Sequence, residues 1–513
     1  MRKYSYILWV LLVVAGFGGA ARFNSQLTAE RARLRLVPAD PLENSPPLVA
    51  FTTVALGGFR GLLADLLWLR ANQLQEDGQY FELVQLADWI TKLEPRFTSI
   101  WAFQAWNMAY NISVLLDRPE DRWRWVRHGI SLLRDEGLRY NPGSAGLHRE
   151  LAWLFFHKMG GDTDQAQLFY KKAWAAEMAA LFEGPQPDYA RWQAVAASRA
   201  ALLQQPGVAA CLAQLQALGQ DPFDVGLLTA TNRSAAVSAV LDRTPAARAV
   251  LDFLRVRRLR EEYRLEPKAM QQVDAAYGPL DWRLPQAHAI YWAVQGKSFA
   301  AGFDAVSLDR QIFQALADGM YKGRLFFNPA EDAFIPSPNF ALLPRVNRIY
   351  EEAIRAHPGE STFLTAQANF LRQAVALLYL YHRNQEAADY LARLRRLVPD
   401  QVKPATLDAF VSDELAAKAD ALSQQEALAQ IEGMAYQGGL WLVAGDQEHA
   451  AGMDQLARQI WKRYMDLRTD PEFRERTGLP PYDQIRRQAL DRARTAAKSA
   501  AARARLDAAQ ARP

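Results

Sequence analysis

The chain has 513 residues, half of them hydrophobic and 23% charged, which is enough to bury a large core and excludes a disordered protein. Its formal net charge of +4 is small for this length, and the excess of basic residues lies near the C-terminus, so we expect no nucleic-acid-binding body. Cys211 is the only cysteine, which excludes internal disulfides and cysteine-based zinc sites.

The N-terminus has the layout of a targeting segment. Arg2 and Lys3 precede an apolar run, Ile7–Ala21, that ends in small residues. This order is typical of a signal peptide, and the run is short for a spanning helix, which needs about 20 residues. Residues 1–21 are therefore expected to be an uncleaved signal anchor or a cleaved signal peptide. The basic side stays in the cytoplasm, so we expect an inner-membrane protein with its body in the periplasm, or a secreted or periplasmic protein after cleavage.

The body of the chain is expected to be all-α. Residues 22–50 are polar, end in a proline-rich stretch and predict a linker. Beyond them Leu, Ala, Gln, Arg and Glu dominate, and alternating β-branched runs are nearly absent. The stretch DGQYFELVQLADWITKLEP places apolar residues at three- and four-residue steps between a turn at Gly78 and a stop at Pro95. The facing side of the preceding helix is expected at Leu63, Leu66, Leu67 and Leu74.

Helix–turn–helix units of this kind recur at intervals of roughly 30 to 45 residues, as in repeat proteins. The first unit has Ala71 in its first helix, Gly78 and Tyr80 at the turn, and Pro95 at its close. Comparable positions in later units are Ala152, Ala166, Tyr170, Ala173, Tyr350, Ala353, Pro358, Ala387, Trp441, Gly445, Ala450 and Ala457. With these residues the chain resembles the tetratricopeptide repeat family over about half its length.

The resemblance implies an α-solenoid in two blocks, N-terminal repeats over residues 51–180 and C-terminal repeats over residues 344–469. Residues 181–343 break the repeat spacing and predict a mostly helical central insertion with ordered loops, one of them FFNPAEDAFIPSPNF. Residues 470–513 predict an exposed, basic, Ala/Arg-rich helical tail.

A search for chemical motifs is negative. A phosphate-binding loop with its lysine and a G-x-S-x-G nucleophile elbow are both missing. His148 and His157 are nine residues apart, on opposite faces of one predicted helix, which is a poor geometry for a metal. We therefore expect no cofactor, no metal and no enzymatic activity.

The stretch YGPLDWRLPQAHAIYWA gathers more polar and aromatic residues than any other. It could be the irregular start of a helix at Pro285, with Asp281 accepting backbone N–H groups in the loop before it. It could also be a ligand-binding loop or, as the weakest alternative, a catalytic group of Asp281 and His288, although no nucleophile beside a base is visible. The candidate ligand-binding residues are Asp281, Trp282, Arg283, His288 and Tyr291.

A second set of candidates follows from the repeat resemblance. In that family the first helix of each pair lines a concave groove, which would expose the polar residues Asn72, Gln104, Asn107, Asn111 and Arg149. Amides both donate and accept hydrogen bonds and so suit an extended peptide or a partner helix. A groove that is only solvated is the alternative.

These features predict a membrane-tethered, extracytoplasmic helical-repeat scaffold or adaptor that binds protein partners in a membrane-associated assembly. The alternative is a small-molecule or glycan binding protein with its site in the central insertion. The sequence leaves the partner and the oligomeric state open.

Overall fold

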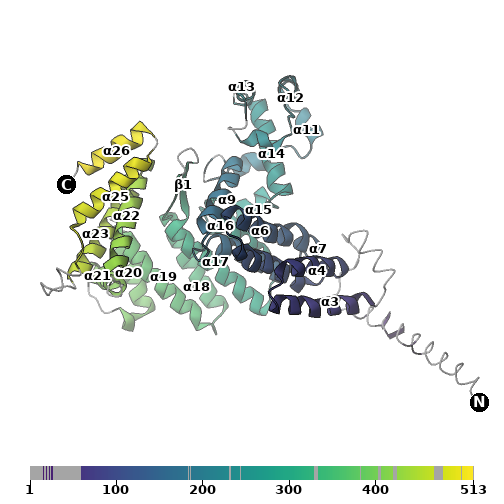
Figure 1. Ribbon diagram of the computed structural model, residues 1–513, viewed down its shortest axis with the longest axis horizontal. Helices are drawn as coiled ribbons and strands as arrows, with labels where there is room; N and C mark the ends of the chain where they lie inside the picture. The colour runs from purple at the N-terminus through teal and green to yellow at the C-terminus, as the bar shows by residue number, and fades with distance from the viewer. Residues whose placement is uncertain are drawn as a thin grey trace, which may run out of the picture. The chain divides into compact units, whose positions relative to one another are not determined.

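The computed structural model describes residues 59–511 except 183, 185, 230–232, 243, 329–332, 382, 403–405, 420–423, 467–477 and 498, together with positions 16, 19, 22, 23, 25, 26 and 30. Helices make up nearly all of the regular structure in this part of the chain (Figure 1). The chain divides into two compact units, residues 1–101 with 139–142, and residues 102–138 with 143–513. The expected all-α class is confirmed.

The first unit contains a helical hairpin, α3 (Phe59–Glu76) and α4 (Tyr80–Leu93). The turn between them uses Gly78 at φ +70°, a left-handed conformation that glycine adopts without steric cost. Leu83, Leu86, Ala87 and Ile90 are buried on α4, as the spacing predicts.

On α3 the prediction of the apolar face is partly wrong. Leu74 is buried together with the small residues Ala64 and Ala71, whereas Leu63 and Leu66 are 39% and 57% exposed. The small side chains form the buried side because they allow α3 and α4 to approach closely.

Three of the helices that follow α4 along the chain continue into π-helical turns. The elements of this stretch are α5 (Thr98–Trp106), η1 (Asn107–Ile112), η2 (Ser113–Leu115), α6 (Pro119–Ser131), η3 (Leu132–Gly137), α7 (Leu138–Tyr140), α8 (Ala145–Trp153), η4 (Leu154–Met159) and α9 (Gln167–Leu181). Of these, η1, η3 and η4 are π-helical and continue α5, α6 and α8. Such turns insert one residue into the helical spacing and often occur at functional sites.

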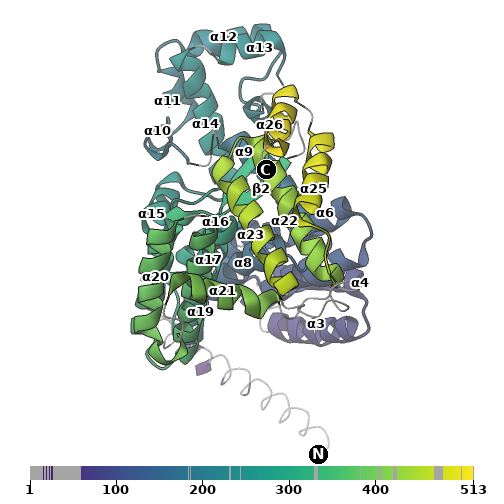
Figure 2. The same cartoon turned by 90° about the vertical axis from the view of Figure 1, so that its left-hand side faces the viewer.

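Of the helices that follow, the short ones before α14 do not form regular hairpins, whereas α16 and α17 pair as a hairpin again. They are α10 (Tyr189–Gln193), α11 (Arg199–Leu203), α12 (Val208–Ala217), η5 (Val225–Leu228), α13 (Ala235–Leu241), α14 (Pro245–Glu261), α15 (Pro267–Tyr277), α16 (Pro285–Lys297) and α17 (Gly302–Lys322). The short helices α11, α12 and α13 all pack on α14, as Figures 1 and 2 show. The pair α16 and α17 packs on α8 on one side, and α17 packs on α18 on the other.

The predicted loop FFNPAEDAFIPSPNF contains a β-hairpin, which corrects the sequence interpretation. Strands β1 (Arg324–Asn328) and β2 (Ala333–Ser337) pair antiparallel, with Phe326 opposite Ile335. Ile335 and Phe326 pack near Trp441, while Leu325 packs against Leu284. Because neighbouring residues of a strand point to opposite faces, this one hairpin joins the helices before it to those after it.

The C-terminal part consists of helices α18 (Leu343–Ala356), α19 (Ser361–Leu380), α20 (Asn384–Leu397), α21 (Leu407–Ala419), α22 (Gln424–Ala444), α23 (Gln447–Asp466), α25 (Tyr482–Ala496) and α26 (Ala500–Gln510), with the 3-10 turns η8 (Phe340–Leu342) and η9 (Pro399–Gln401). The pairs α19–α20 and α22–α23 are helical hairpins, and α25 and α26 pack on α22 (Figure 2). The predicted basic tail is thus not a fully exposed helix, since Ile485, Leu490 and Leu506 are buried.

Among the described residues, no helix combines the length and the apolar character that crossing a membrane requires. The predicted signal segment, residues 1–21, lies outside the described residues apart from positions 16 and 19, and most of the predicted linker does as well.

Candidate functional site

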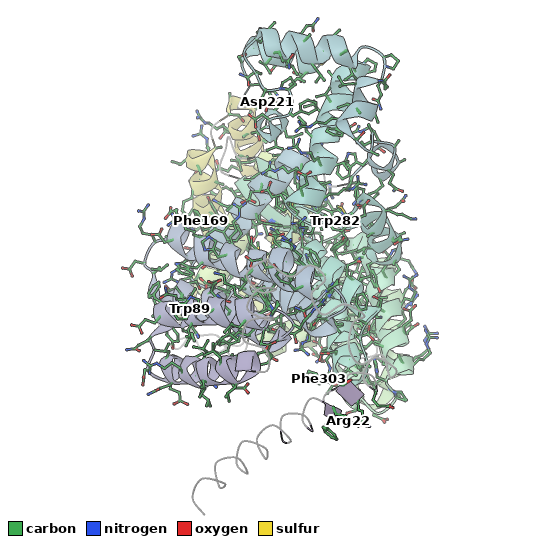
Figure 3. All side chains as sticks on the ribbon, turned by 90° about the vertical axis from the view of Figure 1, so that its right-hand side faces the viewer. Arg22, Trp89, Phe169, Asp221, Trp282 and Phe303 are labelled. Carbon is green, nitrogen blue, oxygen red and sulfur yellow. The ribbon has the colours of Figure 1, made fainter. Side chains whose placement is uncertain are left out.

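The stretch from Tyr277 to Ala293 comprises the last residue of α15, a loop and the start of the buried helix α16. Pro285 occupies the first turn of α16, where its missing N–H costs no hydrogen bond. Trp282, His288 and Tyr291 are all buried, with at most 3% of each residue exposed. Figure 3 shows Trp282 within the packed side chains, in contrast to Phe303, which is 74% exposed.

Asp281 and Arg283 form a clamp on the β-hairpin. Arg283 donates from Nε and Nη2 to the two oxygens of Asp281, at 2.8 and 2.7 Å. The same carboxylate accepts the backbone N–H of Leu325 at 3.1 Å, and Arg283 Nη2 donates to the Leu325 carbonyl at 2.6 Å. Both polar groups of Leu325 are therefore bound to this pair, which fixes the first strand to the loop before α16.

His288 lies in the core and binds the backbone of the same loop. Its Nε2 lies 2.9 Å from the carbonyl oxygen of Trp282, and its ring stacks on Phe155 with centroids 5.2 Å apart. Trp174 meets the ring edge-on at 4.9 Å. Burial lowers the pKa of His288 to about 4, so the ring is neutral at physiological pH.

The five residues are thus brought together, but as packing and hydrogen-bonding partners. Asp281 binds Arg283 and Leu325, and His288 binds the backbone of Trp282, so the acid and the base have separate partners. This arrangement argues against Asp281 and His288 as catalytic groups. It equally argues against these five side chains as the walls of a ligand pocket.

The amide side chains that were expected to face a groove are mostly buried. Gln104 and Asn107 are buried, 2% and 1% exposed, and Asn107 accepts a 2.9 Å hydrogen bond from Asn111, which is half-buried. They share the buried side of the helix with Met108 and Ile112. The prediction that Gln104 and Asn107 face a groove is wrong, because both side chains lie on the buried side of the helix.

Arg149 and Asn72, the other two residues predicted to line the groove, do not lie together with these amides. Arg149 pairs with Glu150 at 2.9 Å and with Asp304, which connects α8 to the first turn of α17. Asn72 is half-buried on α3 and belongs to the other compact unit.

The surface next to these amides is aromatic. Trp106 stacks on Tyr110, with centroids 5.1 Å apart, and the Tyr110 hydroxyl lies 3.0 Å from Nδ1 of His157. The His157 ring stacks in turn on Trp153 at 4.7 Å and 9°, and Trp153 contacts Phe156. Trp106 is 42% exposed and the other four are half-buried. We call Trp106, Tyr110, Trp153, Phe156 and His157 the aromatic surface.

A buried ion pair lies beneath the aromatic surface. Lys158 donates to Asp164 at 2.5 Å, and both side chains are nearly inaccessible to solvent. The Lys158 ammonium lies 5.0 Å from the centre of the Tyr110 ring, and Asp164 also accepts the hydroxyl of Tyr170 at 3.3 Å. Burial would raise the pKa of Asp164, but its bonds to Lys158 and to the Ala166 N–H lower it overall. Burial lowers the pKa of Lys158, and the Asp164 carboxylate opposes that shift. The pair packs against Tyr110 and helps to hold its ring in place.

Sequence reasoning missed the aromatic surface, although a signal was present. Trp106 and Tyr110 are four residues apart, as are Trp153 and His157, which places each pair on one helical side. Burial also keeps His157 and Tyr110 neutral, since it lowers the pKa of the imidazole and raises that of the phenol. The surface can therefore offer flat rings and neutral hydrogen-bonding groups to a partner. Among the described residues, no cluster of three or more acidic, histidine or cysteine side chains is placed to hold a metal.

Comparison with known proteins gives little further identification. No protein-family model matches the chain, and no curated protein matches it. Among solved structures it matches a circular tandem repeat protein with novel repeat topology and enhanced subunit contact surfaces, at 13% identity and a TM-score of 0.17. The match covers 88% of this chain and 94% of that one. At this TM-score the match supports no argument about the arrangement of the helices or about function.

Proposed function

We propose that this protein is a tetratricopeptide-like scaffold or adaptor that binds a protein partner through its aromatic surface. The observation that carries the proposal is the exposed Trp106 ring, which stacks on Tyr110. Tyr110 is held in turn by His157, whose ring stacks on Trp153. Exposed tryptophan and tyrosine are enriched at protein interfaces and provide much of their binding energy. Rings that are already fixed lose little side-chain freedom when a partner binds.

The kind of partner follows from the chemistry of the surface. Flat aromatic faces and neutral polar groups suit an extended peptide or an amphipathic helix, which would stack apolar side chains on Trp106 and Trp153. The half-buried Asn111 at its edge can donate and accept one further hydrogen bond.

The location of the assembly is proposed from the N-terminal segment. The basic start and the apolar run Ile7–Ala21 favour tethering to the inner membrane with the body in the periplasm. A partner would then be membrane-associated or periplasmic.

The test is crosslinking mass spectrometry on native membranes that contain the tagged full chain. We expect a specific partner to be recovered with the wild type and to be reduced about tenfold or more with W106A, since interface tryptophans contribute about 2 kcal/mol or more. The matched control is L364A on α19, where a comparable fraction of the residue, 41%, is exposed.

Two results would contradict the proposal separately. Equal recovery of the partner with W106A and L364A would remove the aromatic surface from the interaction. Recovery of the chain in the soluble cytoplasmic fraction would remove the proposed location without touching the binding surface.

A further inference from the structure

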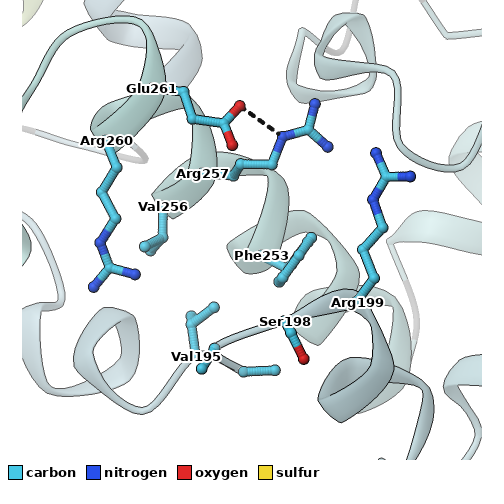
Figure 4. A pocket seen from close by; sticks show the side chains of 10 residues that line it. Val195, Ser198, Arg199, Phe253, Val256, Arg257, Arg260 and Glu261 are labelled. Carbon is cyan, nitrogen blue, oxygen red and sulfur yellow. Dashed lines mark hydrogen bonds and ion pairs between the residues drawn. The ribbon is translucent and has the colours of Figure 1, made fainter. Parts of the chain in front are cut away.

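A second feature of the second unit is a cavity in the part of the chain that precedes α15. Its volume is about 430 Å³, and α14 and the segment leading into α11 line it (Figure 4). The lining includes Ser198, Arg199, Phe253, Val256, Arg257 and Arg260. The volume lies within the range of small-molecule sites, roughly 300 to 1,000 Å³.

The sequence of α14 explains the character of the cavity. Phe253, Val256, Arg257 and Arg260 recur at one-, three- and four-residue steps, so one side of the helix carries an apolar strip flanked by guanidinium groups. On the opposite wall Ser198 caps α11, because its hydroxyl accepts the N–H of Ala201 at 3.2 Å. The cavity therefore has an apolar floor and a rim on which Arg199, Arg257 and Arg260 outnumber the acidic Glu261.

Two of the guanidinium groups retain unused donors. Arg257 donates from Nε to Glu261 at 3.1 Å, but its Nη1 is shielded from solvent and has no hydrogen-bond partner among the described residues. A buried N–H without a partner destabilises the folded protein, so it is rare unless a ligand or water binds there.

Arg199 is the second such group. Its guanidinium group lies 4.3 Å from the centre of the Phe223 ring, and no carboxylate in the described part of the chain forms an ion pair with it. Arg260, in contrast, is neutralised by two hydrogen bonds to Glu266, at 2.8 and 2.9 Å. In Figure 4 the guanidinium groups of Arg199 and Arg257 lie toward the same side of the cavity, and that of Arg260 lies toward the other.

We propose that this cavity binds a small molecule that carries a phosphate or carboxylate group next to an apolar portion. The anion accepts hydrogen bonds from Arg257 Nη1 and from Arg199, since guanidinium groups match the geometry of both anions. The apolar portion rests on Phe253 and Val256. This site is separate from the aromatic surface and does not depend on the proposed function.

The test is calorimetric titration of the detergent-purified full chain with phenyl phosphate, which combines an anion with an apolar ring. We expect saturable binding, with phenol at least tenfold weaker because it lacks the charge. R257Q and R199Q should each weaken binding of phenyl phosphate at least tenfold. The matched control is R248Q, an exposed arginine on the same helix that does not line the cavity.

The outcomes distinguish a specific binding site from nonspecific attraction of an anion to surface arginines. Benzoate as a further probe separates a carboxylate site from a phosphate site, and tighter binding of either supports the proposal. Non-saturable heats, equal binding of phenol, or equal loss in R248Q and R257Q would overturn it. If R257Q fails to fold by circular dichroism, R199Q decides, because Arg199 is exposed and its substitution leaves the core intact.

Discussion

The loop before α16 and the aromatic surface both contain polar and aromatic residues, but these residues are buried in the loop and partly exposed in the aromatic surface. In the loop, Asp281 and His288 are 5% and 1% exposed and each binds a protein group. In the aromatic surface, Trp106 is 42% exposed and one of its faces stacks on a fixed neighbour. The comparison teaches that a high density of polar and aromatic residues marks an anchoring point of the fold. Side-chain surface left over after packing is the better indicator of a binding site.

Of the substitutions that test this comparison, removal of the Asp281 carboxylate is expected to lower the stability of the protein most. D281A leaves Arg283 without its partner and the Leu325 N–H without an acceptor. Breaking a buried pair in this way destabilises by about 3–5 kcal/mol. Denaturant unfolding of the full chain should show the loss, and hydrogen exchange should show it first at β1.

The control for this prediction is D88A, which breaks an exposed pair with Lys92. Such pairs contribute about 0.5 kcal/mol or less. If D281A were no less stable than D88A, the loop before α16 would not anchor the hairpin.

The pH dependence of stability is the next largest effect. The folded-state pKa of His288 is about 4, below its ordinary value of 6.5, so the unfolded state binds the proton more readily between these values. The contribution of His288 to the free energy of unfolding is therefore fully present above pH 6.5. It is lost as the pH is lowered toward 4, which reduces the free energy of unfolding by up to about 3 kcal/mol.

The variant H288F isolates that contribution, because phenylalanine keeps the stacking on Phe155 but cannot be protonated. Urea unfolding of both proteins at pH 7, 5.5 and 4 should give a smaller loss for H288F. His148 and His157, whose pKa values burial also lowers, remain in both. An identical pH dependence would show that His288 is not held neutral by the core.

A smaller effect is expected at the helix crossing that supports Trp106. A Cβ on Gly129 of α6 would lie 2.8 Å from the backbone oxygen of Ala105, next to Trp106. G129A should therefore destabilise by about 1–2 kcal/mol despite the higher helix propensity of alanine.

The matched control is G433A on α22, where an added Cβ meets nothing within 4 Å. It should stabilise by about 0.5–1 kcal/mol through helix propensity alone. Thermal unfolding of both variants gives the sign of each change. Stabilisation by both would mean that α6 and the helix carrying Trp106 can move apart, and that the aromatic surface is not rigidly supported.

Local patterns predicted the helical elements well. The apolar spacing of α4, the turn at Gly78 and the proline at the start of α16 are all found as the sequence indicates. These features depend on neighbours within one or two helical turns. The tetratricopeptide assignment and the boundaries of the central insertion stay predictions.

Features that depend on distant contacts were not predictable in the same way. The β-hairpin was interpreted as a loop because β2 contains Pro336 and its pairing is stabilised by Trp441 and Leu284. The predicted groove failed at Gln104 and Asn107 because it followed from the repeat resemblance, whereas the buried side of a helix depends on the helices that pack on it. The arginines of α14 lie close together in the sequence, but the cavity requires the segment before α11 as its second wall.

The central claim is that a protein partner binds at the aromatic surface, and site-specific photocrosslinking tests it most directly. A benzophenone amino acid replaces Phe156 of the aromatic surface in one full-length variant, which leaves Trp106 in place, and Leu364 in another. Both variants are irradiated in native membranes. The account predicts one discrete crosslinked partner from position 156 and none of that mass from position 364. No partner at 156, or the same products from both positions, would contradict it.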